Sequence, residues 1–400
     1  MTAANNPVRL LLLGRGLRAF VDGCVAVLLP AYLLGLGFGP WDVGVLSTTT
    51  LLGSALATMA VGRWGHLVDA RRLLLAAALL MATTGLAFAG MPGLGVFWPL
   101  LLVAFVGTLN PSGGDVSVFL PLEHARLADA AQGNARTTLF ARYSVVGALS
   151  GAFGALAAAL PDLLRSTSGV DPLATMRAVF IGYALIGLLI FGLYRRLPRV
   201  SSVAQTMPMP LGPSRPIVLR LAALFSVDSF AGGLVVNALL SLWLFERFGL
   251  SLTAAAVFFF WSGLLSAASQ LAAPRVAARF GLLNTMVFTH IPASLCLIAA
   301  ALAPSAVVAL ALLLVRAALS QMDVPTRSAF VMAVVTPPER AAAASFTAVP
   351  RSLAAAAGPS IGAAMLASGW LAAPLVACGV LKIGYDLALL LAFRRHRSQR

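Results

Sequence analysis

The chain has 400 residues, of which 60% are hydrophobic and only 10% are charged. A soluble domain carries about 25% charged residues, so this composition indicates a membrane protein with its apolar residues in long runs. The net charge of +15 could suggest nucleic-acid binding, but no soluble domain is predicted that would display a basic face, and this class is excluded.

Gly, Pro and charge clusters divide the chain into apolar segments of about 20 residues, the length that crosses a bilayer. The first segment is too long for a signal peptide, and we expect it to be retained. In chain order the predicted spans are 10–36, 42–62, 72–91, 95–119, 135–160, 174–195, 217–245, 252–273, 282–302, 305–323, 341–367 and 371–393. This pattern predicts an all-α membrane protein with twelve transmembrane helices.

Connecting segments rich in Lys and Arg alternate along the chain with segments that contain few of them. Both ends of the chain belong to the basic set. The positive-inside rule therefore predicts that both termini are cytoplasmic. The longest polar interruption is rich in Pro and Ser and lies at mid-chain. We interpret residues 197–216 as a cytoplasmic linker between two six-helix bundles, residues 1–196 and 217–400.

An internal repeat relates these two halves. Three charged positions recur in the same order at offsets of 206, 208 and 209 residues: Asp22 with Asp228, Asp115 with Asp323, and Arg142 with Arg351. A shared, slowly drifting offset predicts two copies of one bundle in parallel orientation.

The twelve spans, the repeat, the central loop and a G-x-x-x-D…R-R loop resemble the major facilitator superfamily. The loop follows span two and contains Gly65, Asp69, Arg71 and Arg72. In that family the loop latches helix ends on the cytoplasmic side and controls the change of state. Within that family the sequence pattern most resembles the drug:proton antiporter branch, although span five reads GALSGAFG and lacks the Gly-Pro of that branch.

The resemblance implies that spans one, four, seven and ten line a central cavity, and each of them holds one aspartate. An ionised group at mid-bilayer costs about 2.5–3.5 kcal/mol, so these residues are expected to be paired or to face water. Asp22 is predicted as a proton-coupling acid, or else as a fixed partner of Arg18 one turn away. Asp228 has no arginine within a turn and is predicted to titrate more freely. Thr108 and Ser112 continue a polar stripe on span four.

Two ion pairs related by the repeat are predicted at a cytoplasmic gate. They join Asp115 to Arg142 and Asp323 to Arg351, with Arg327 one turn beyond Asp323. Each pair acts either as a switch between states or only as a link between helices. On span twelve, Lys382 and Asp386 are expected to form a structural pair, and His290 of span nine is expected to be packed or hydrogen-bonded.

These features predict a monomeric secondary active transporter that moves a small, partly apolar solute by alternating access, with proton-coupled efflux as the favoured direction. Uptake, facilitated diffusion and a non-transporting assembly or sensor role stay open. An ATP-driven pump is excluded because there is no Walker A motif, and an intramembrane protease is disfavoured because its motifs stand in the wrong order. Neither a cofactor nor a metal is expected. The expected partners are a small-molecule substrate, protons and the lipid bilayer. The arginine-rich basic composition suggests a bacterial inner membrane.

Overall fold

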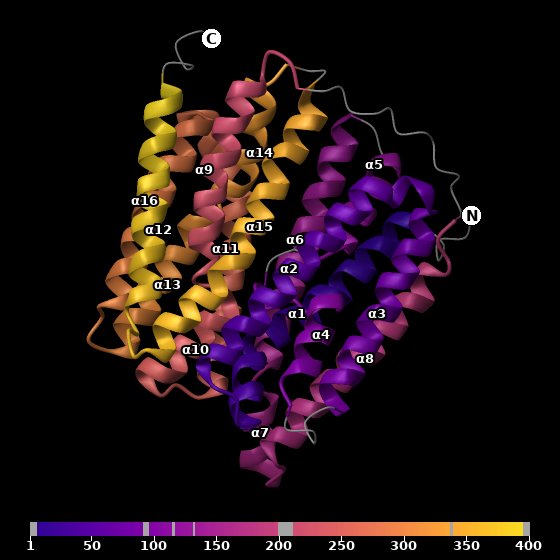
Figure 1. Cartoon of the computed structure of the whole chain (residues 1–400), viewed down its shortest axis with the longest axis vertical. Coiled ribbons are helices and arrows are strands. Elements are labelled where there is room, and N and C mark those ends of the chain that lie inside the picture. The colour runs from indigo at the N-terminus through magenta and orange to yellow at the C-terminus, as the bar shows by residue number, and fades with distance from the viewer. Residues whose placement is uncertain are drawn as a thin grey trace.

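A computed structural model describes residues 6–90, 96–113, 117–130, 133–198, 211–336 and 339–394, and within these ranges every regular element is helical. The expected all-α fold is therefore confirmed (Figure 1). The first half contains α1 (Pro7–Gly35), α2 (Pro40–Trp64), a 3-10 turn (Gly65–Leu67), α3 (Ala70–Gly90), α4 (Trp98–Val106), α5 (Phe119–Ala130), α6 (Gly133–Ala157), α7 (Leu160–Ser168) and α8 (Pro172–Tyr194). The second half contains α9 (Arg215–Gly233), α10 (Asn237–Phe248), α11 (Leu252–Phe280), α12 (Leu282–Ala301), α13 (Ala306–Ser320), α14 (Asp323–Val334), α15 (Arg340–Ala367) and α16 (Ala373–Phe393).

Local sequence sets where these helices begin and end. Ser251 caps α11 by accepting a hydrogen bond from the Ala254 amide at 3.1 Å. Gly249 ends α10 with a φ of 61°, a left-handed conformation that favours glycine. Such signals lie close together in the sequence, so most predicted spans and helices share nearly the same bounds.

Ten segments of the described chain are long and apolar enough to cross a membrane. Two further predicted spans fall on α15 and on the pair α4 and α5, between which residues 114–116 lie outside the described residues. The number twelve therefore stays a prediction.

Two predicted spans of the second half prove to be broken helices. The span 217–245 is interrupted between α9 and α10, and the span 305–323 ends at Ser320, with α14 starting anew at Asp323. Pro325 lies just after this second break, in the first turn of α14, where its missing amide hydrogen costs nothing. Breaks of this kind free backbone polar groups at membrane depth, where they require a protein or water-lined surrounding.

The two halves repeat one pattern of neighbours. In the first half α1 packs on α6 and α3 packs on α8, and in the second half α9 packs on α15 and α12 packs on α16. Between the halves, α2 contacts α15 and α6 contacts α11. This is the arrangement expected of a duplicated bundle. The boundaries predicted for the bundles and the linker stay predictions, since residues 199–210 lie outside the described residues.

The glycines of predicted span five serve close packing against α1. A Cβ at Gly154 would stand 1.7 Å from the carbonyl oxygen of Phe20, and the Cβ of any residue at Gly23 would meet the backbone of Gly151. Small residues at such crossings let helices approach in lipid, where packing rather than water drives association.

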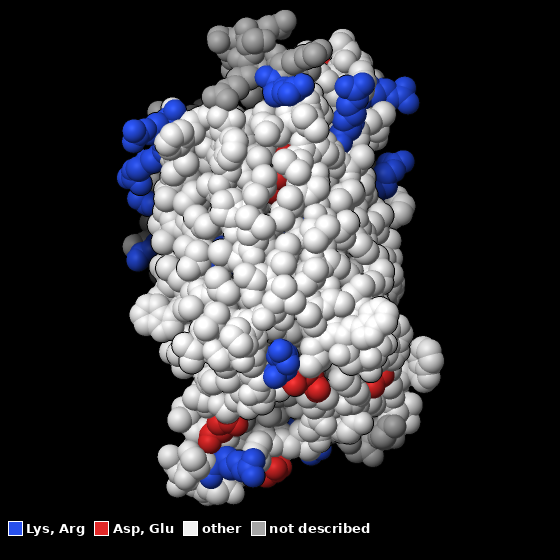
Figure 2. All heavy atoms as spheres, turned by 90° about the vertical axis from the view of Figure 1, so that its left-hand side faces the viewer, with Lys and Arg blue, Asp and Glu red and all other residues white. Residues whose placement is uncertain are grey.

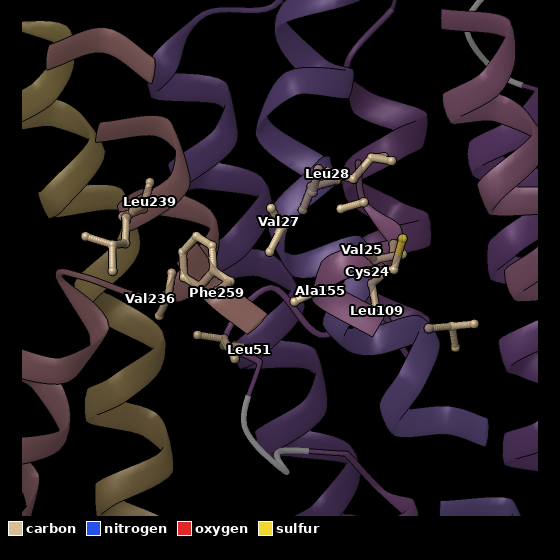
Figure 3. Packing of buried hydrophobic residues seen from close by; sticks show 14 of the residues in the cluster. Cys24, Val25, Val27, Leu28, Leu51, Leu109, Ala155, Val236, Leu239 and Phe259 are labelled. Atoms are coloured by element: carbon tan, nitrogen blue, oxygen red, sulfur yellow. The ribbon is translucent and has the colours of Figure 1, made fainter. Parts of the chain in front are cut away.

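The bundles are joined mainly at the end opposite to the one where α1 begins and α16 ends (Figure 1). We call these the opposite end and the terminal end. A hydrophobic cluster that extends along the first bundle also includes residues of the second half. Val27 of α1, Leu239 of α10 and Phe259 of α11 lie together in it where the halves meet (Figure 3). A second cluster, at the terminal end, consists of residues of the second half only.

Hydrogen bonds between the bundles lie in the same region. Ser241 Oγ donates to the Val27 carbonyl at 3.1 Å, and Ser360 Oγ lies 2.8 Å from Thr48 Oγ1. Asp162, in α7, accepts from the amide of Thr253 at 2.9 Å. The structure is therefore a state in which the opposite end holds the halves together.

The surface charge follows the same axis. Figure 2 shows a broad band almost without charged side chains, with Lys and Arg at the terminal end and mixed charges at the opposite end. An uncharged band of this kind fits a surface in contact with lipid tails.

Candidate functional site

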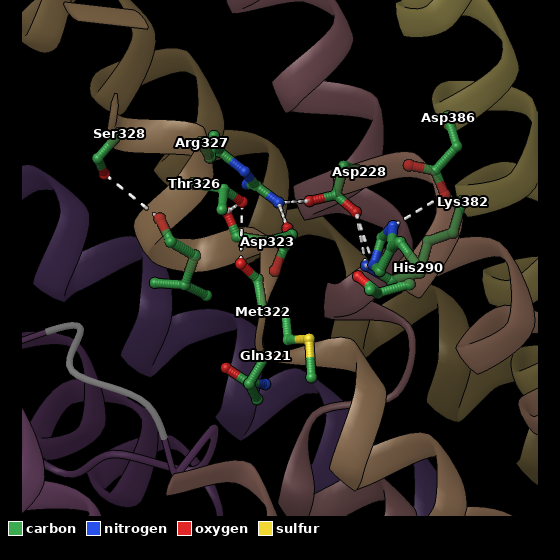
Figure 4. Close-up of polar contacts among 12 residues, drawn as sticks. Asp228, His290, Gln321, Met322, Asp323, Thr326, Arg327, Ser328, Lys382 and Asp386 are labelled. Atoms are coloured by element: carbon green, nitrogen blue, oxygen red, sulfur yellow. Dashed lines mark hydrogen bonds and ion pairs between the residues drawn. The ribbon is translucent and has the colours of Figure 1, made fainter. Parts of the chain in front are cut away.

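The candidate site is a cluster of charged side chains inside the second bundle, centred on Asp228 of α9 (Figure 4). The Asp228 side chain is buried, and its two oxygens face different cations. Lys382 Nζ of α16 lies 2.6 Å from Oδ1, and Arg327 Nη2 of α14 lies 2.7 Å from Oδ2. One carboxylate thus links three helices by charge-assisted hydrogen bonds.

A histidine extends the cluster to a second carboxylate. His290 Nδ1 of α12 lies 2.9 Å from Asp386 Oδ2 of α16. His290 Nε2 lies 3.5 Å from Lys382 Nζ and 3.9 Å from Asp228 Oδ1. When Nδ1 holds the proton shared with Asp386, Nε2 is free to accept a hydrogen bond from Lys382. The chain Asp386–His290–Lys382–Asp228 is therefore continuous.

The break between α13 and α14 positions the other side of the cluster. Asp323 is the first residue of α14, where the positive end of the helix dipole favours a carboxylate. Arg327 follows one turn later, contacts Asp323 and Asp228 together, and places its guanidinium 5.1 Å from the centre of the Phe225 ring. Arg327 is thus fixed by two anions and an aromatic face.

A cavity of about 180 Å³ lies beside these groups. All of its lining residues belong to the second bundle: Asp228, His290, Ala293, Ser294, Arg316, Ser320, Gln321, Asp323, Val324, Arg327 and Lys382. The cavity is therefore bordered both by the break between α13 and α14 and by the charged cluster.

Two expectations about these residues need correction. Lys382 forms its ion pair with Asp228 and not with Asp386, which instead bonds to His290. Asp228 is held between two cations, so it does not lack charged partners as its own helix suggested. Lys382 faces α9, whereas Asp386, one turn later on α16, faces α12.

The predicted pair of Asp323 with Arg351 also changes. Asp323 pairs with Arg327 in its own helix, while Arg351 of α15 is near enough to interact electrostatically with the same aspartates. Its symmetric counterpart is not described, because Asp115 lies outside the described residues, and Arg142 of α6 is exposed.

The first bundle holds a separate buried ion pair that the sequence analysis missed. Arg18 of α1 pairs with Glu123 of α5 at 2.5 Å between Nη1 and Oε1, and both side chains are at most 1% exposed. Glu123 also accepts hydrogen bonds from the hydroxyls of Tyr143 and Tyr194. Glu123 was overlooked because it lies in α5, which begins at Phe119, where the predicted span four ends. A single Glu within FLPLEHARL was the available signal.

The two buried pairs correspond through the repeat with their charges reversed. Arg18–Glu123 joins α1 to α5, and Asp228–Arg327 joins α9 to α14. The offset of 206 places Asp228 opposite Asp22, one turn after Arg18, and the offset of 208 places Arg327 opposite Phe119, one turn before Glu123. An ion pair therefore joins the corresponding two helices in each half, but its residues are displaced by one helical turn between the halves.

The remaining predicted residues of the first bundle lie near this pair or beside it. Asp22 is buried in α1 and interacts electrostatically with Tyr183 of α8. Thr108 bonds to the same tyrosine, 3.1 Å between the hydroxyl oxygens, whereas Ser112 bonds to Asn110 at 2.7 Å. Thr108 and Asp22 thus share one neighbour.

The loop between α2 and α3 forms a latch at the terminal end. Asp69 accepts a hydrogen bond from the Arg71 amide at 3.0 Å, and the Arg71 guanidinium bonds to the carbonyls of Tyr194 and Arg195 after α8. Arg126 of α5 lies 4.0 Å from Asp69. Gly65 follows α2, and Arg72 is exposed. The loop therefore links α3, α5 and α8.

A second latch, not related to the first by the repeat, is built on Glu339 between α14 and α15. Its buried carboxylate accepts hydrogen bonds from the Gly212 and Ser214 amides and the Thr336 hydroxyl. Hydrogen bonds from Ser214 and Thr336 lower the pKa of Glu339 from 4.5 to about 2. The carboxylate thus anchors the chain that leads into α9.

This latch predicts a pH dependence of stability. Because the pKa of Glu339 is lower in the folded than in the unfolded chain, its contribution is complete above about pH 4.5 and is lost as pH falls toward about 2. The melting temperature of Glu339→Gln is expected to lie below that of wild type at pH 7, with the gap narrowing as pH falls below about 4.5. Thermal unfolding in detergent at several pH values measures this gap, and a gap that stays constant down to pH 3 would contradict the prediction.

Comparisons with known proteins agree with this architecture. The Major Facilitator Superfamily profile matches residues 11–324. An uncharacterized membrane protein of Saccharomyces cerevisiae is 23% identical over 430 residues, covering 98% of this chain and 94% of the relative. A D-xylose-proton symporter has a similar structure, with a TM-score of 0.77, 16% identity and 96% of each chain covered. The nucleoside transporter NupG has a TM-score of 0.71 and 17% identity over 99% of this chain and 100% of its own.

At these identities the solved structures establish the fold and leave the solute open. The drug-efflux branch suggested by the sequence stays a prediction. The family match and the transporter folds indicate a transporter and not an enzyme. Together with the helical repeat and the multi-pass apolar surface, they show that the chain belongs to the Major Facilitator Superfamily.

Proposed function

We propose that this chain is a proton-coupled secondary transporter that moves a small, partly apolar solute by alternating access. The observation that carries the proposal is the buried Asp228 carboxylate, shared by Lys382 of α16 and Arg327 of α14. Protonation of Asp228 would remove the charge that holds both cations, so α14 and α16 would be free to move relative to α9.

The groups around Asp228 suit the exchange of a proton. Arg327 and Asp323 face it from α14, Lys382 and Tyr385 from α16, His290 from α12 and Arg351 from α15. His290 can carry a proton on either ring nitrogen and reaches both Lys382 and Asp386. It offers a route for a proton between the two carboxylates. Asp22 is proposed as a second coupling acid, in the first bundle.

Two directions of transport are candidates. Efflux in exchange for protons is the direction that the sequence predicts. Uptake together with protons is favoured by the charge around the cavity, where Arg316, Arg327 and Lys382 face only Asp228 and Asp323. Protonating Asp228 would add to this positive excess and would strengthen, not weaken, the binding of an anionic solute.

The proposed setting is a bacterial inner membrane with both termini in the cytoplasm and the protein acting as a monomer. Lys and Arg gathered at the terminal end in Figure 2 support this orientation. The state described here would then be closed to the outside, because the contacts between bundles lie at the opposite end.

Reconstitution into proteoliposomes tests the function. Compounds that raise the melting temperature of the purified protein are loaded on one side, and their flux and the internal pH are recorded under inward, outward and absent proton gradients. We expect flux that follows the gradient with matched proton movement, and a decrease in Asp22→Asn if Asp22 also couples. Gradient-independent flux would indicate facilitated diffusion. The absence of flux for every compound that binds would indicate an assembly or sensor protein.

A further inference from the structure

We propose that Arg316 and Ser294 bind a carboxylate group of the transported solute, within the cavity of the second bundle. The inference rests on the proposed transport function and names the chemical class of its substrate. It starts from a cation with no ion pair and a hydroxyl with no hydrogen bond among the residues that the structure describes.

Arg316 is the cation that the charged cluster does not use. It lies on α13, one turn before Ser320, and lines the cavity. Asp228 and Asp323 are engaged by Lys382 and Arg327, and within the described chain Arg316 forms no ion pair. A guanidinium at membrane depth is costly without a counter-charge. The cavity therefore presents a positive group that an anion can neutralise.

Ser294 supplies a hydroxyl to the same cavity. It lies on α12, one turn after His290, and its residue is 2% exposed. Its Oγ has no hydrogen-bond partner among the described residues, and it does not bond to the carbonyl of its own preceding turn as Thr289 does. An unsatisfied buried hydroxyl loses free energy unless a ligand or water completes it. Arg316 and Ser294 approach the cavity from different helices and can therefore bind one group together.

The size and charge of the cavity select a monocarboxylate. Its volume of about 180 Å³ corresponds to roughly six water molecules at ~30 Å³ each, enough for a carboxylate and a few carbon atoms. Arg316 is a single uncompensated cation, which matches one negative charge and not the two of a phosphate monoester. The planar guanidinium also bonds a carboxylate through two parallel hydrogen bonds. Ser320 and Gln321, at the break between α13 and α14, add polar atoms.

Binding measurements on the purified full chain in detergent test this site without any proton gradient. The probes are acetate, butyrate and benzoate, each compared with acetamide, butyramide or benzamide, and with inorganic phosphate. Calorimetry and thermal shift are expected to show binding of the carboxylates and none of the neutral amides. Arg316→Gln is expected to raise Kd by roughly tenfold to a hundredfold, with a smaller loss in Arg316→Lys and Ser294→Ala.

Arg220→Gln serves as the matched control, since it removes an exposed arginine of α9 that lies outside the cavity. Its Kd is expected to equal that of wild type. Equal binding of amides and carboxylates, tighter binding of phosphate, no carboxylate binding at all, or an unchanged Kd in a folded Arg316→Gln would each overturn the proposal. Carboxylate binding without gradient-driven flux would retain the site and reject the proton coupling, so the two failures are distinguishable.

Discussion

Replacing Asp228 by asparagine is expected to abolish gradient-driven transport and to lower the stability of the protein. The amide cannot take up and release a proton, and it leaves the buried Lys382 ammonium without a carboxylate. Arg327 keeps Asp323 as a partner, so the loss falls mainly on Lys382. Breaking a buried ion pair by removing one partner costs about 3–5 kcal/mol. Thermal unfolding and proteoliposome flux measure the two effects.

A double variant separates coupling from folding. Asp228→Asn with Lys382→Met removes both members of the pair, so no buried charge is left unpaired, and the melting temperature is expected to recover most of the loss. Proton-driven flux is not expected to recover, because the titrating carboxylate is still missing. Asp171→Asn is the control, since it changes an exposed carboxylate that caps α8 and asparagine caps a helix equally well. Full gradient-dependent flux in the double variant would show that Asp228 is not the coupling acid.

Replacing Glu123 by glutamine is expected to destabilise the first bundle more than any change on its surface. The Arg18 guanidinium, 1% exposed, would lose its charged partner, and the hydroxyls of Tyr143 and Tyr194 would lose an anionic acceptor. The expected loss is about 3–5 kcal/mol. It is measured as a lower melting temperature and a lower yield of monodisperse protein.

Two further variants test whether the loss of stability comes from the broken Arg18–Glu123 ion pair. Glu246→Gln changes an exposed glutamate at the end of α10 and is expected to change the free energy of unfolding by less than about 0.5 kcal/mol. Arg18→Met with Glu123→Leu removes both charges and is expected to restore most of the stability lost in Glu123→Gln. If the single Glu123→Gln variant melts at the wild-type temperature, the pair does not hold α1 to α5.

The candidate site was only partly visible in the sequence. Asp228, Asp323 and Arg327 stood out because a charge inside an apolar run is locally conspicuous. Lys382 was visible too, but its role was not, because its partner Asp228 is 154 residues away. Arg316 also stands inside an apolar run, but only the engagement of Asp228 and Asp323 by other cations shows that it forms no ion pair within the described chain.

The sequence by itself determined the membrane class, the positions of most helices and the internal repeat. These depend on hydropathy, helix-ending residues and charge spacing, all of which are read along the chain. The tertiary structure alone decided which charges meet: Asp228 with Lys382, His290 with Asp386, and Arg18 with Glu123. The physical reason is that such contacts depend on the rotation and crossing of helices, and on breaks such as the one before Asp323. These features are set by packing between segments far apart in the chain.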